Sequence, residues 1–446
     1  SMGQFIYIHV PFCEARCPYC DFFTQGSGRE ARELADEWLK LVARELVLWV
    51  QAGDLRQDVP VATIYFGGGT PSLVSPDALK KFLTTVRDQV PFAADVEITM
   101  EMQPATADER KVAGYAEAGV NRFSIGVQSL TPRLLAFLER RHTVEDSLAL
   151  IDAARKYGRL SLDLIAALPG QTLADWQAEL EQAIASGAEH LSVYELTYYR
   201  GTRLREALEQ GRTSEPGEEQ RLALYEYTVE RLTAAGYEQY EISNFARPGC
   251  RSRHNENYWK LGDYVGLGAG AHSFVCPHRH LNPPDVERYR AAIRAGRLAR
   301  EISDPGDDEI FAAENLFMGL RLAEGVDLDA FRARFGVDVR AQFASRLEPL
   351  IEGGFMRLAG NRLQLTHAGR LRADAVGDHH GVGRVSDDTP GCLIRHLEDD
   401  LAIAAVVRDP GDALAGADRR DAEALPPSQW STARAAVSCG RQTQRC

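Results

Sequence analysis

The chain has 446 residues, enough for two or three domains, and its 44% hydrophobic and 26% charged residues are ordinary for a globular protein. A formal net charge of −13, with no Lys/Arg-rich run, argues against a nucleic-acid-binding surface. No apolar run has transmembrane length, and eight cysteines, three of them clustered, fit a reducing compartment better than a disulfide framework. We therefore expect a soluble cytoplasmic protein.

Residues 5–196 alternate short β-rich runs with amphipathic helical stretches. We expect strands at 5–10, 62–66, 96–101, 122–126, 160–165 and 191–196. The intervening segments read as helices, for example 33–49 and a helix that begins at Pro76 with Ser75 as its N-cap. Six strand–helix repeats predict an α/β fold, an open partial (β/α)6 barrel with functional groups at the C-terminal ends of its parallel strands.

The pattern becomes mixed after residue 200. A helix is expected at 218–235, a glycine run spans 262–270, and residues 266–273 are interpreted as a tight loop packed on the barrel mouth. Helices at 310–320, 329–335 and 341–352, followed by strands at 355–358 and 362–365, predict a winged-helix-like domain. The expected domains are 1–200 (partial barrel), 201–300 (barrel completion) and 301–376 (winged-helix-like). Residues 377–446, apart from a short helix at 394–407, are expected to be disordered or non-native.

Three cysteines near the N-terminus carry the sharpest chemical signal. Cys13, Cys17 and Cys20 are spaced C-x3-C-x2-C and follow an apolar run. Three thiolates in one loop can hold three irons of a [4Fe–4S] cluster and leave the fourth iron open. The amino and carboxylate groups of S-adenosylmethionine can chelate such an iron. The alternatives are a zinc site, with His9 as a further ligand, or buried thiols.

Polar groups and glycines at several strand ends predict a ligand site at one rim of the sheet. Gly67-Gly68-Gly69-Thr70 follows the second strand, where glycines let the backbone approach a ligand, although a tight turn would use them too. Glu101, Gln128 and Asp163 stand at the ends of three further strands, and Arg140 lies in the segment between two of them. Each carboxylate alone could simply be a solvated side chain at a strand end, but together these polar groups favour a ligand-binding site.

The segment His254-Asn255-Glu256-Asn257-Tyr258-Trp259 is the second distinctive feature. An imidazole beside Tyr258 and Trp259 can ligate a haem iron while the aromatic rings contact the macrocycle. A lone histidine is more commonly a satisfied core or surface residue, so that alternative stays open here.

Together these residues resemble the radical S-adenosylmethionine family of oxygen-independent coproporphyrinogen oxidases and their relatives, over about residues 5–375. The motifs that carry the resemblance are Tyr7-Ile8-His9-Val10-Pro11-Phe12-Cys13, Gly67-Gly68-Gly69-Thr70-Pro71, Gly126-Val127-Gln128-Ser129 and Asp163-Leu164-Ile165. The resemblance implies that Cys13, Cys17 and Cys20 hold the cluster. It assigns contacts to a first S-adenosylmethionine to Tyr7, Tyr19, Gly68, Gly69, Thr70 and Glu101. Gln128, Arg140 and Asp163 match positions that bind a second one in the oxidase.

Within this family the chain resembles the haem-chaperone branch. The oxidase carries a fourth cysteine two residues after the third, where this chain has Phe22, and the chaperone branch carries the H-N-x-x-Y-W segment. Among the departures, Gln103 replaces an Asn, and Ala166-Ala167 replaces a Tyr-Gly pair. The resemblance thus implies a carrier that binds haem through His254, with Tyr258 and Trp259 nearby.

The partners implied are haem, haem-accepting proteins such as respiratory haem enzymes, and an electron donor. Membrane contact would be indirect, through those acceptors, and a homodimer stays open, as does enzymatic activity. The alternative function is that of the oxidase itself, which converts coproporphyrinogen III to protoporphyrinogen IX by radical chemistry on the bound S-adenosylmethionine.

Overall fold

The computed structural model of the chain describes residues 3–20, 23–26, 28–199, 201–304 and 308–376. The expectations for residues 377–446, including the helix at 394–407, lie outside the described residues. Among the helices of the described part, none is long and apolar enough to cross a membrane.

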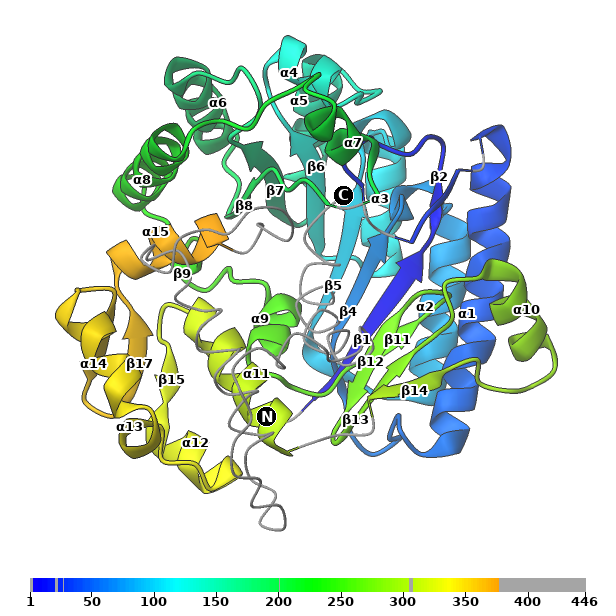
Figure 1. Cartoon of the computed structure of the whole chain (residues 1–446). Helices are drawn as coiled ribbons and strands as arrows, with labels where there is room; N and C mark the ends of the chain where they lie inside the picture. Colours follow the sequence, from blue (N-terminus) through cyan, green and yellow to red (C-terminus); the bar gives the residue numbers. More distant parts are fainter. Residues whose placement is uncertain (1–2, 21–22, 27, 200, 305–307, 377–446) are drawn as a thin grey trace.

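A curved nine-stranded sheet forms the centre of the molecule (Figure 1). Its six central strands are parallel neighbours and confirm the predicted α/β partial barrel: β1 (Gln4–Val10), β4 (Val61–Gly68), β5 (Phe92–Met102), β6 (Arg122–Gln128), β7 (Arg159–Ala166) and β8 (His190–Glu195). β11 (Val265–Leu267) pairs parallel with β1. β10 (Asn244–Ala246) and β9 (Glu238–Glu241) extend the other edge in antiparallel orientation. Of the tight loop expected at 266–273, only residues 268–271 lie outside strands, because Gly266 and Leu267 belong to β11 and residues 272–273 to a later strand.

Helices cover the outer face of this sheet (Figure 1). They are α1 (Ala31–Ala52), α2 (Pro76–Gln89), α3 (Glu109–Ala118), α5 (Val144–Ala154), α6 (Leu173–Ala185) and α8 (Glu218–Ala234). The short helices α4 (Pro132–Phe137) and α7 (Arg203–Glu209) pack together in a separate apolar cluster, where the Leu204 amide donates to the Pro18 carbonyl. The predicted start of α2 is confirmed, since the Ser75 hydroxyl accepts a hydrogen bond from the Ala78 amide at 3.1 Å. Thr143 and Thr172 close capping boxes at α5 and α6, which fixes where these helices begin.

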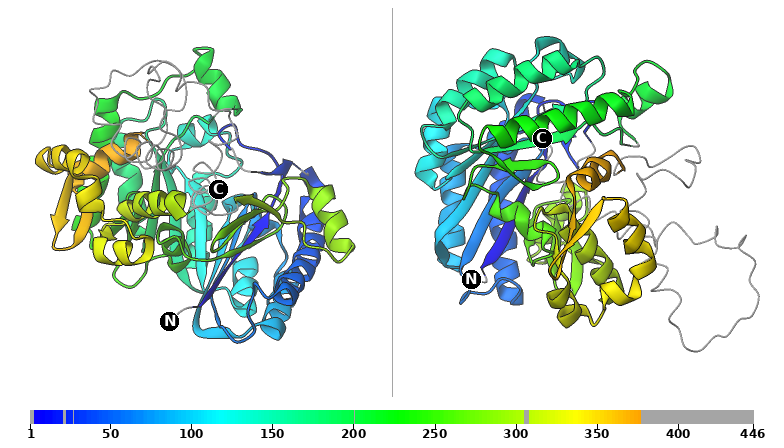
Figure 2. Two further views of the ribbon diagram at one scale, coloured as in Figure 1. Left: turned by 60° about the horizontal axis from the view of Figure 1, so that its bottom comes forward. Right: turned by 90° about the vertical axis from the view of Figure 1, so that its left-hand side faces the viewer.

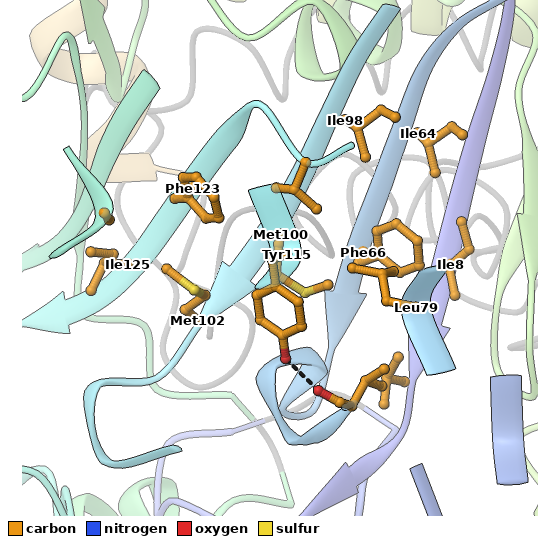
Figure 3. Close-up of a cluster of buried hydrophobic side chains, with 14 of the residues drawn as sticks. Ile8, Ile64, Phe66, Leu79, Ile98, Met100, Met102, Tyr115, Phe123 and Ile125 are labelled. Carbon is orange, nitrogen blue, oxygen red and sulfur yellow. Dashed lines mark hydrogen bonds between the residues drawn. The ribbon is translucent and has the colours of Figure 1, made fainter. Parts of the chain in front are cut away.

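The two faces of the parallel strands differ in polarity. Alternate residues such as Ile8, Phe66, Met100 and Phe123 pack into one apolar core with the helices (Figure 3). The residues between them are also buried but largely polar, among them His9, Thr63, Thr99, Glu101, Arg122, Ser124, Ser161, Asp163, His190 and Ser192. Because side chains alternate along a strand, this second set lies on the face away from the helices. The inside of the barrel is therefore a polar lining that requires partners for its buried groups.

Residues 244–304 add a short helix, α9 (Arg253–Trp259), and α10 (Val286–Arg294) beside a small sheet of β12 (His272–Val275), β13 (His278–Leu281) and β14 (Glu301–Asp304). The buried carboxylate of Glu45 on α1 fixes this region. It accepts hydrogen bonds from the Gly268 amide at 2.8 Å, the Tyr289 hydroxyl at 2.5 Å and the Asn282 amide at 2.7 Å. Burial raises the pKa of Glu45, and these donors oppose that shift.

The C-terminal part lies beside the β9 edge of the barrel (Figures 1 and 2). It contains α11 (Asp308–Arg321), β15 (Val326–Asp327), α12 (Leu328–Phe335), α13 (Val339–Gln342), α14 (Ala344–Glu352), β16 (Met356–Ala359), β17 (Arg362–Leu365) and α15 (His367–Val376). The helix expected at 341–352 is split into α13 and α14, because Phe343 has φ −116° and ψ 17°. Arg321 joins this part to the barrel, with Nη2 2.7 Å from Oε1 of the fully buried Glu241.

Candidate functional site

The three cysteines lie in one loop at the C-terminal end of β1. Cys13 ends the two-residue strand β2 (Phe12–Cys13), which pairs with β3 (Gln25–Gly26), and the Cys20 amide donates to the Cys17 carbonyl at 3.3 Å. The Thr70 hydroxyl lies 3.5 Å from the Cys13 sulfur, and Arg140 Nη1 lies 3.4 Å from the Cys17 sulfur. Burial raises the pKa of Cys13. Among the described side chains, no three His, Cys, Asp or Glu residues converge in metal-binding geometry.

The glycine loop after β4 packs directly on the cysteine loop. The Gly69 amide donates to the Val10 carbonyl at 2.7 Å, and the Thr70 amide donates to that of Phe12 at 2.9 Å. A Cβ on Gly69 would lie 2.8 Å from both the Cys13 sulfur and the Phe12 carbonyl oxygen. Gly68 has φ +116°, which side-chain-bearing residues rarely adopt. The close approach therefore requires glycine at both positions.

Two buried carboxylates lie on the inner face of the sheet, Glu101 on β5 and Asp163 on β7, with β6 between them. Glu101 Oε1 accepts a hydrogen bond from the Tyr65 hydroxyl at 2.7 Å, whereas Oε2 has no hydrogen-bond partner within the described part of the chain. Burial raises the pKa of Glu101 well above its usual value, and nearby Asp163 adds to that shift. The Asp163 carboxylate accepts from the Ser124 hydroxyl at 3.2 Å, and burial raises its pKa to about 7. Both groups can accept from a ligand's hydroxyl or ammonium group.

The other residues assigned to S-adenosylmethionine lie around the same rim. Gln128 ends β6 with φ 64°, a left-handed conformation that costs energy in a residue with a side chain and is common at functional sites. The Tyr7 hydroxyl lies 2.9 Å from His9 Nδ1, and Arg140 donates to the Tyr19 hydroxyl at 3.3 Å. A cavity of about 160 Å³ beside this rim is lined by Cys17, Thr70 and Arg140 among others. The fold thus brings the cysteine loop, the glycine loop and Arg140 together.

His254 lies apart from that rim, deep inside the molecule. It is in the first turn of α9, its ring is 1% exposed, and its two ring nitrogens lie 2.6 Å from the Thr63 hydroxyl and 2.8 Å from the Tyr258 hydroxyl. Burial, assisted by the positive charge of Arg122, lowers the pKa of His254 to about 3. The imidazole is therefore neutral, with both nitrogens occupied in this conformation.

Trp259, at the other end of α9, is covered by the C-terminal part. Its ring is 2% exposed and packs with Met318 and Leu322, and the Arg321 guanidinium lies 4.9 Å from its centroid. Helix α11 thus closes the candidate haem segment from outside.

Sequence reasoning missed the role of two inner-face residues, Tyr65 and Arg122, and considered a third, His9, only as a zinc ligand. Tyr65 connects His254 with Glu101, and Arg122 lies close enough to affect the pKa of both His254 and Asp163. His9 has both ring nitrogens engaged, by the Tyr7 hydroxyl and by the Phe23 carbonyl at 2.9 Å, so this conformation offers neither to zinc. Tyr65 stands two residues before the glycine motif, and period-two alternation with Thr63 could have placed it on the inner face.

Three features of this rim fit an iron–sulfur cluster with S-adenosylmethionine. They are the three thiols, a glycine cradle that a Cβ would fill, and an unused Glu101 oxygen within the described residues. The fold and site define a radical S-adenosylmethionine protein: the sequence model of the Radical SAM superfamily matches residues 7–183, and that of the HemN C-terminal domain matches residues 307–372. This class implies a [4Fe–4S] cluster and S-adenosylmethionine.

Comparison with individual proteins identifies the family within this class. The chain is 38% identical to the haem chaperone HemW of Synechocystis sp. over 329 residues, covering 72% of this chain and 78% of the relative. It is 35% identical to HemW of Bacillus subtilis, covering 83% and 97%, and 33% identical to radical S-adenosyl methionine domain-containing protein 1 of Danio rerio, covering 83% and 85%. The chain belongs to the HemW family.

A solved structure shows the same fold. Coproporphyrinogen III oxidase (HemN) of Escherichia coli superposes with a TM-score of 0.72, covering 90% of each chain, at 22% sequence identity. This likeness confirms the architecture of the barrel and carries no assignment of substrate.

Proposed function

We propose that this protein binds haem and delivers it to haem-accepting proteins such as respiratory haem enzymes. In this proposal Cys13, Cys17 and Cys20 hold the [4Fe–4S] cluster, and the rim around Thr70 and Glu101 binds S-adenosylmethionine. When bound, the cluster and S-adenosylmethionine supply one-electron chemistry, for which an electron donor is required. The cluster can also serve stability or dimerisation.

One observation carries this proposal: the H-N-x-x-Y-W segment stands on α9 in a chain whose relatives include proteins named haem chaperones. Imidazole is a common axial ligand of haem iron, and the tyrosine and tryptophan rings of the segment can contact the macrocycle. We assign His254 as the haem contact, with Tyr258 and Trp259 beside it. Because both ring nitrogens of His254 are occupied, ligation of iron requires its Tyr258 or Thr63 contact to open.

A second candidate is oxygen-independent coproporphyrinogen III oxidase activity. It is favoured by the complete rim, in which Arg140 reaches the Cys17 sulfur and Glu101 keeps one oxygen unused within the described residues. Against it stands the absence from the sequence of a cysteine at position 22, where the chain has Phe.

Anaerobic haem titration of the cluster-reconstituted protein tests the proposal, with coproporphyrinogen III turnover measured in parallel. His254→Ala should abolish a stoichiometric haem spectrum. His190→Ala is a matched control, because His190 is equally buried between the Ser161 hydroxyl at 2.8 Å and the Tyr240 hydroxyl at 2.7 Å but lies outside the segment. If both variants lose haem binding equally, the loss reflects a disturbed fold and not the removal of a haem ligand. Protoporphyrinogen formation without specific haem binding would favour the oxidase.

A further inference from the structure

Tyr65 lies between the candidate haem residue and a candidate S-adenosylmethionine residue. Its ring stacks on that of His254, with centroids 5.1 Å apart and planes inclined by 26°. Its hydroxyl donates to Glu101 Oε1 at 2.7 Å. Tyr65 is 1% exposed, so no water layer separates it from either neighbour. Tyr65 therefore contacts both places to which separate ligands are assigned, whereas Tyr7, whose ring centroid lies 6.5 Å from that of His254, has no hydrogen bond to Glu101 among those of the described residues.

Strand β4 holds His254 through two side chains of its inner face. Thr63 bonds His254 Nδ1 at 2.6 Å, and Tyr65, two residues further along the same strand, supplies the ring on which the imidazole stacks. The strand therefore defines where the imidazole lies, although α9 is 191 residues away in sequence from Thr63.

The same tyrosine also defines the orientation of Glu101. The Tyr65 hydroxyl binds one carboxylate oxygen and leaves Oε2 as the one without a hydrogen-bond partner in the described structure. A ligand group approaching the rim meets that second oxygen only while the first is held. Rotation of the Tyr65 ring would release Oε1 and change the direction of the carboxylate.

We propose that Tyr65 is a positioning residue that makes haem binding at His254 and S-adenosylmethionine binding at Glu101 antagonistic. This inference rests on the proposed function. Iron ligation requires a ring nitrogen that is now bonded, and when the imidazole frees that nitrogen by turning away from Tyr258, Tyr65 loses its stacking partner. Conversely, a ligand that holds Glu101 and Tyr65 in place favours the stacked imidazole. Thermodynamic linkage makes the two effects equal in size.

The test is the dissociation constant of S-adenosylmethionine for the cluster-reconstituted protein, measured anaerobically by equilibrium dialysis with and without saturating haem. Coupling between sites is typically about 5- to 150-fold, and we expect haem to weaken binding by about tenfold in the unaltered protein. Haem affinity should fall by the same factor when S-adenosylmethionine is saturating.

Tyr65→Phe separates the two contacts, because it keeps the stacked ring and removes the hydroxyl. It should weaken S-adenosylmethionine binding about fivefold without haem, as expected for one ordinary hydrogen bond, and reduce the effect of haem to less than about twofold. Tyr237→Phe is the matched control, since its buried hydroxyl donates to the Ala188 carbonyl far from both sites. The double variant Glu101→Gln with Tyr65→Phe should lose no more affinity for S-adenosylmethionine than the weaker-binding single variant, because the two residues act as one unit.

The outcomes separate the inference from the function on which it rests. Failure of the unaltered protein to bind haem stoichiometrically overturns both. Stoichiometric haem binding that leaves the S-adenosylmethionine constant unchanged overturns the antagonism alone. A tenfold effect of haem that persists in Tyr65→Phe, or additive effects in the double variant, shows that the coupling does not pass through Tyr65. A circular dichroism spectrum equal to that of the unaltered protein confirms that Tyr65→Phe is folded.

Discussion

Gly69 lies so close to Cys13 that a Cβ added to the glycine would be 2.8 Å from the cysteine sulfur. The glycine loop and the cysteine loop are therefore one packed unit. Gly69→Ala should displace the Cys13 sulfur from its present position. It should lower the affinity for iron by about tenfold or more, as substitutions beside metal ligands typically do. Iron and sulfide content after anaerobic reconstitution, together with the cluster absorbance, measures this effect.

Gly217→Ala is the control for that substitution. Gly217 has φ −62°, and nothing lies within 4 Å of a Cβ added there, so the same methyl group should leave cluster content unchanged. Normal iron content in Gly69→Ala would contradict the close contact.

Asp163→Asn should change the dependence of stability on pH. Burial raises the pKa of Asp163 to about 7, so the folded protein retains a proton that the unfolded chain, with a pKa near 3.8, loses at lower pH. Stability from this group is therefore fully present below about pH 4 and falls as the pH rises through about 7. Asparagine does not ionise, so the variant should gain thermal stability relative to the unaltered protein at about pH 8 but not at about pH 4.

The exposed Asp152, which is paired with Arg155 on α5, supplies the control variant Asp152→Asn. Its melting temperature should differ from that of the unaltered protein by the same small amount at both pH values. An Asp163→Asn difference that is also independent of pH would mean that Asp163 ionises normally.

Haem association should be limited by a conformational step. His254 is 1% exposed and both its nitrogens are bonded, so under the proposed function a rearrangement must precede ligation. In stopped-flow experiments the observed rate should reach a plateau as haem concentration increases. Tyr258→Phe removes one of the two hydrogen bonds of the imidazole and should raise that plateau about fivefold. A rate that remains proportional to haem at all concentrations would show that His254 is already accessible.

Ala167→Gly should stabilise the protein. Ala167 stands where the family resemblance places a glycine, and its φ of 57° is in the left-handed region, which costs about 1–2 kcal/mol for a residue with a Cβ. Removing the buried methyl group costs about 0.8 kcal/mol, so the net gain is about 0.2–1.2 kcal/mol. Scanning calorimetry should show a higher melting temperature, whereas Ala166→Gly, within β7, should lower it.

Much of the fold could be predicted because the six parallel strands are continuous apolar or alternating runs separated by capped helices. β9, β10 and β11 could not, because each has only three or four residues, and β10 and β11 join the sheet through strands far away in sequence, β8 and β1. The break between α13 and α14 was equally invisible, since it depends on the backbone angles of Phe343 rather than on a glycine or proline.

The candidate site was also predictable only in part. Glu101, Gln128 and Asp163 could be placed at one rim because the ends of parallel strands converge. The surroundings of His254 could not be predicted, because Thr63, which bonds it, is 191 residues away. The role of Tyr65 was hidden for another reason, since a tyrosine in a strand is ordinary in a sheet and only the pairing of β4 with β5 brings its hydroxyl to Glu101.

The ion pair between Arg321 and Glu241 has a consequence for dissecting this protein. Glu241 is fully buried in the barrel, and its neutralising charge comes from α11, in the C-terminal part. Among the described residues of the barrel, Glu241 accepts hydrogen bonds only from uncharged donors, the Ser243 amide at 2.9 Å and the Asn244 side-chain amide at 2.7 Å. Replacing Arg321 alone by an uncharged residue would leave the carboxylate buried without its cation, at a cost of about 3–5 kcal/mol. Removing residues 308–376 would instead open Glu241 and Trp259 to water. The C-terminal part therefore supplies the counterion of a barrel residue and also excludes the water that could replace it.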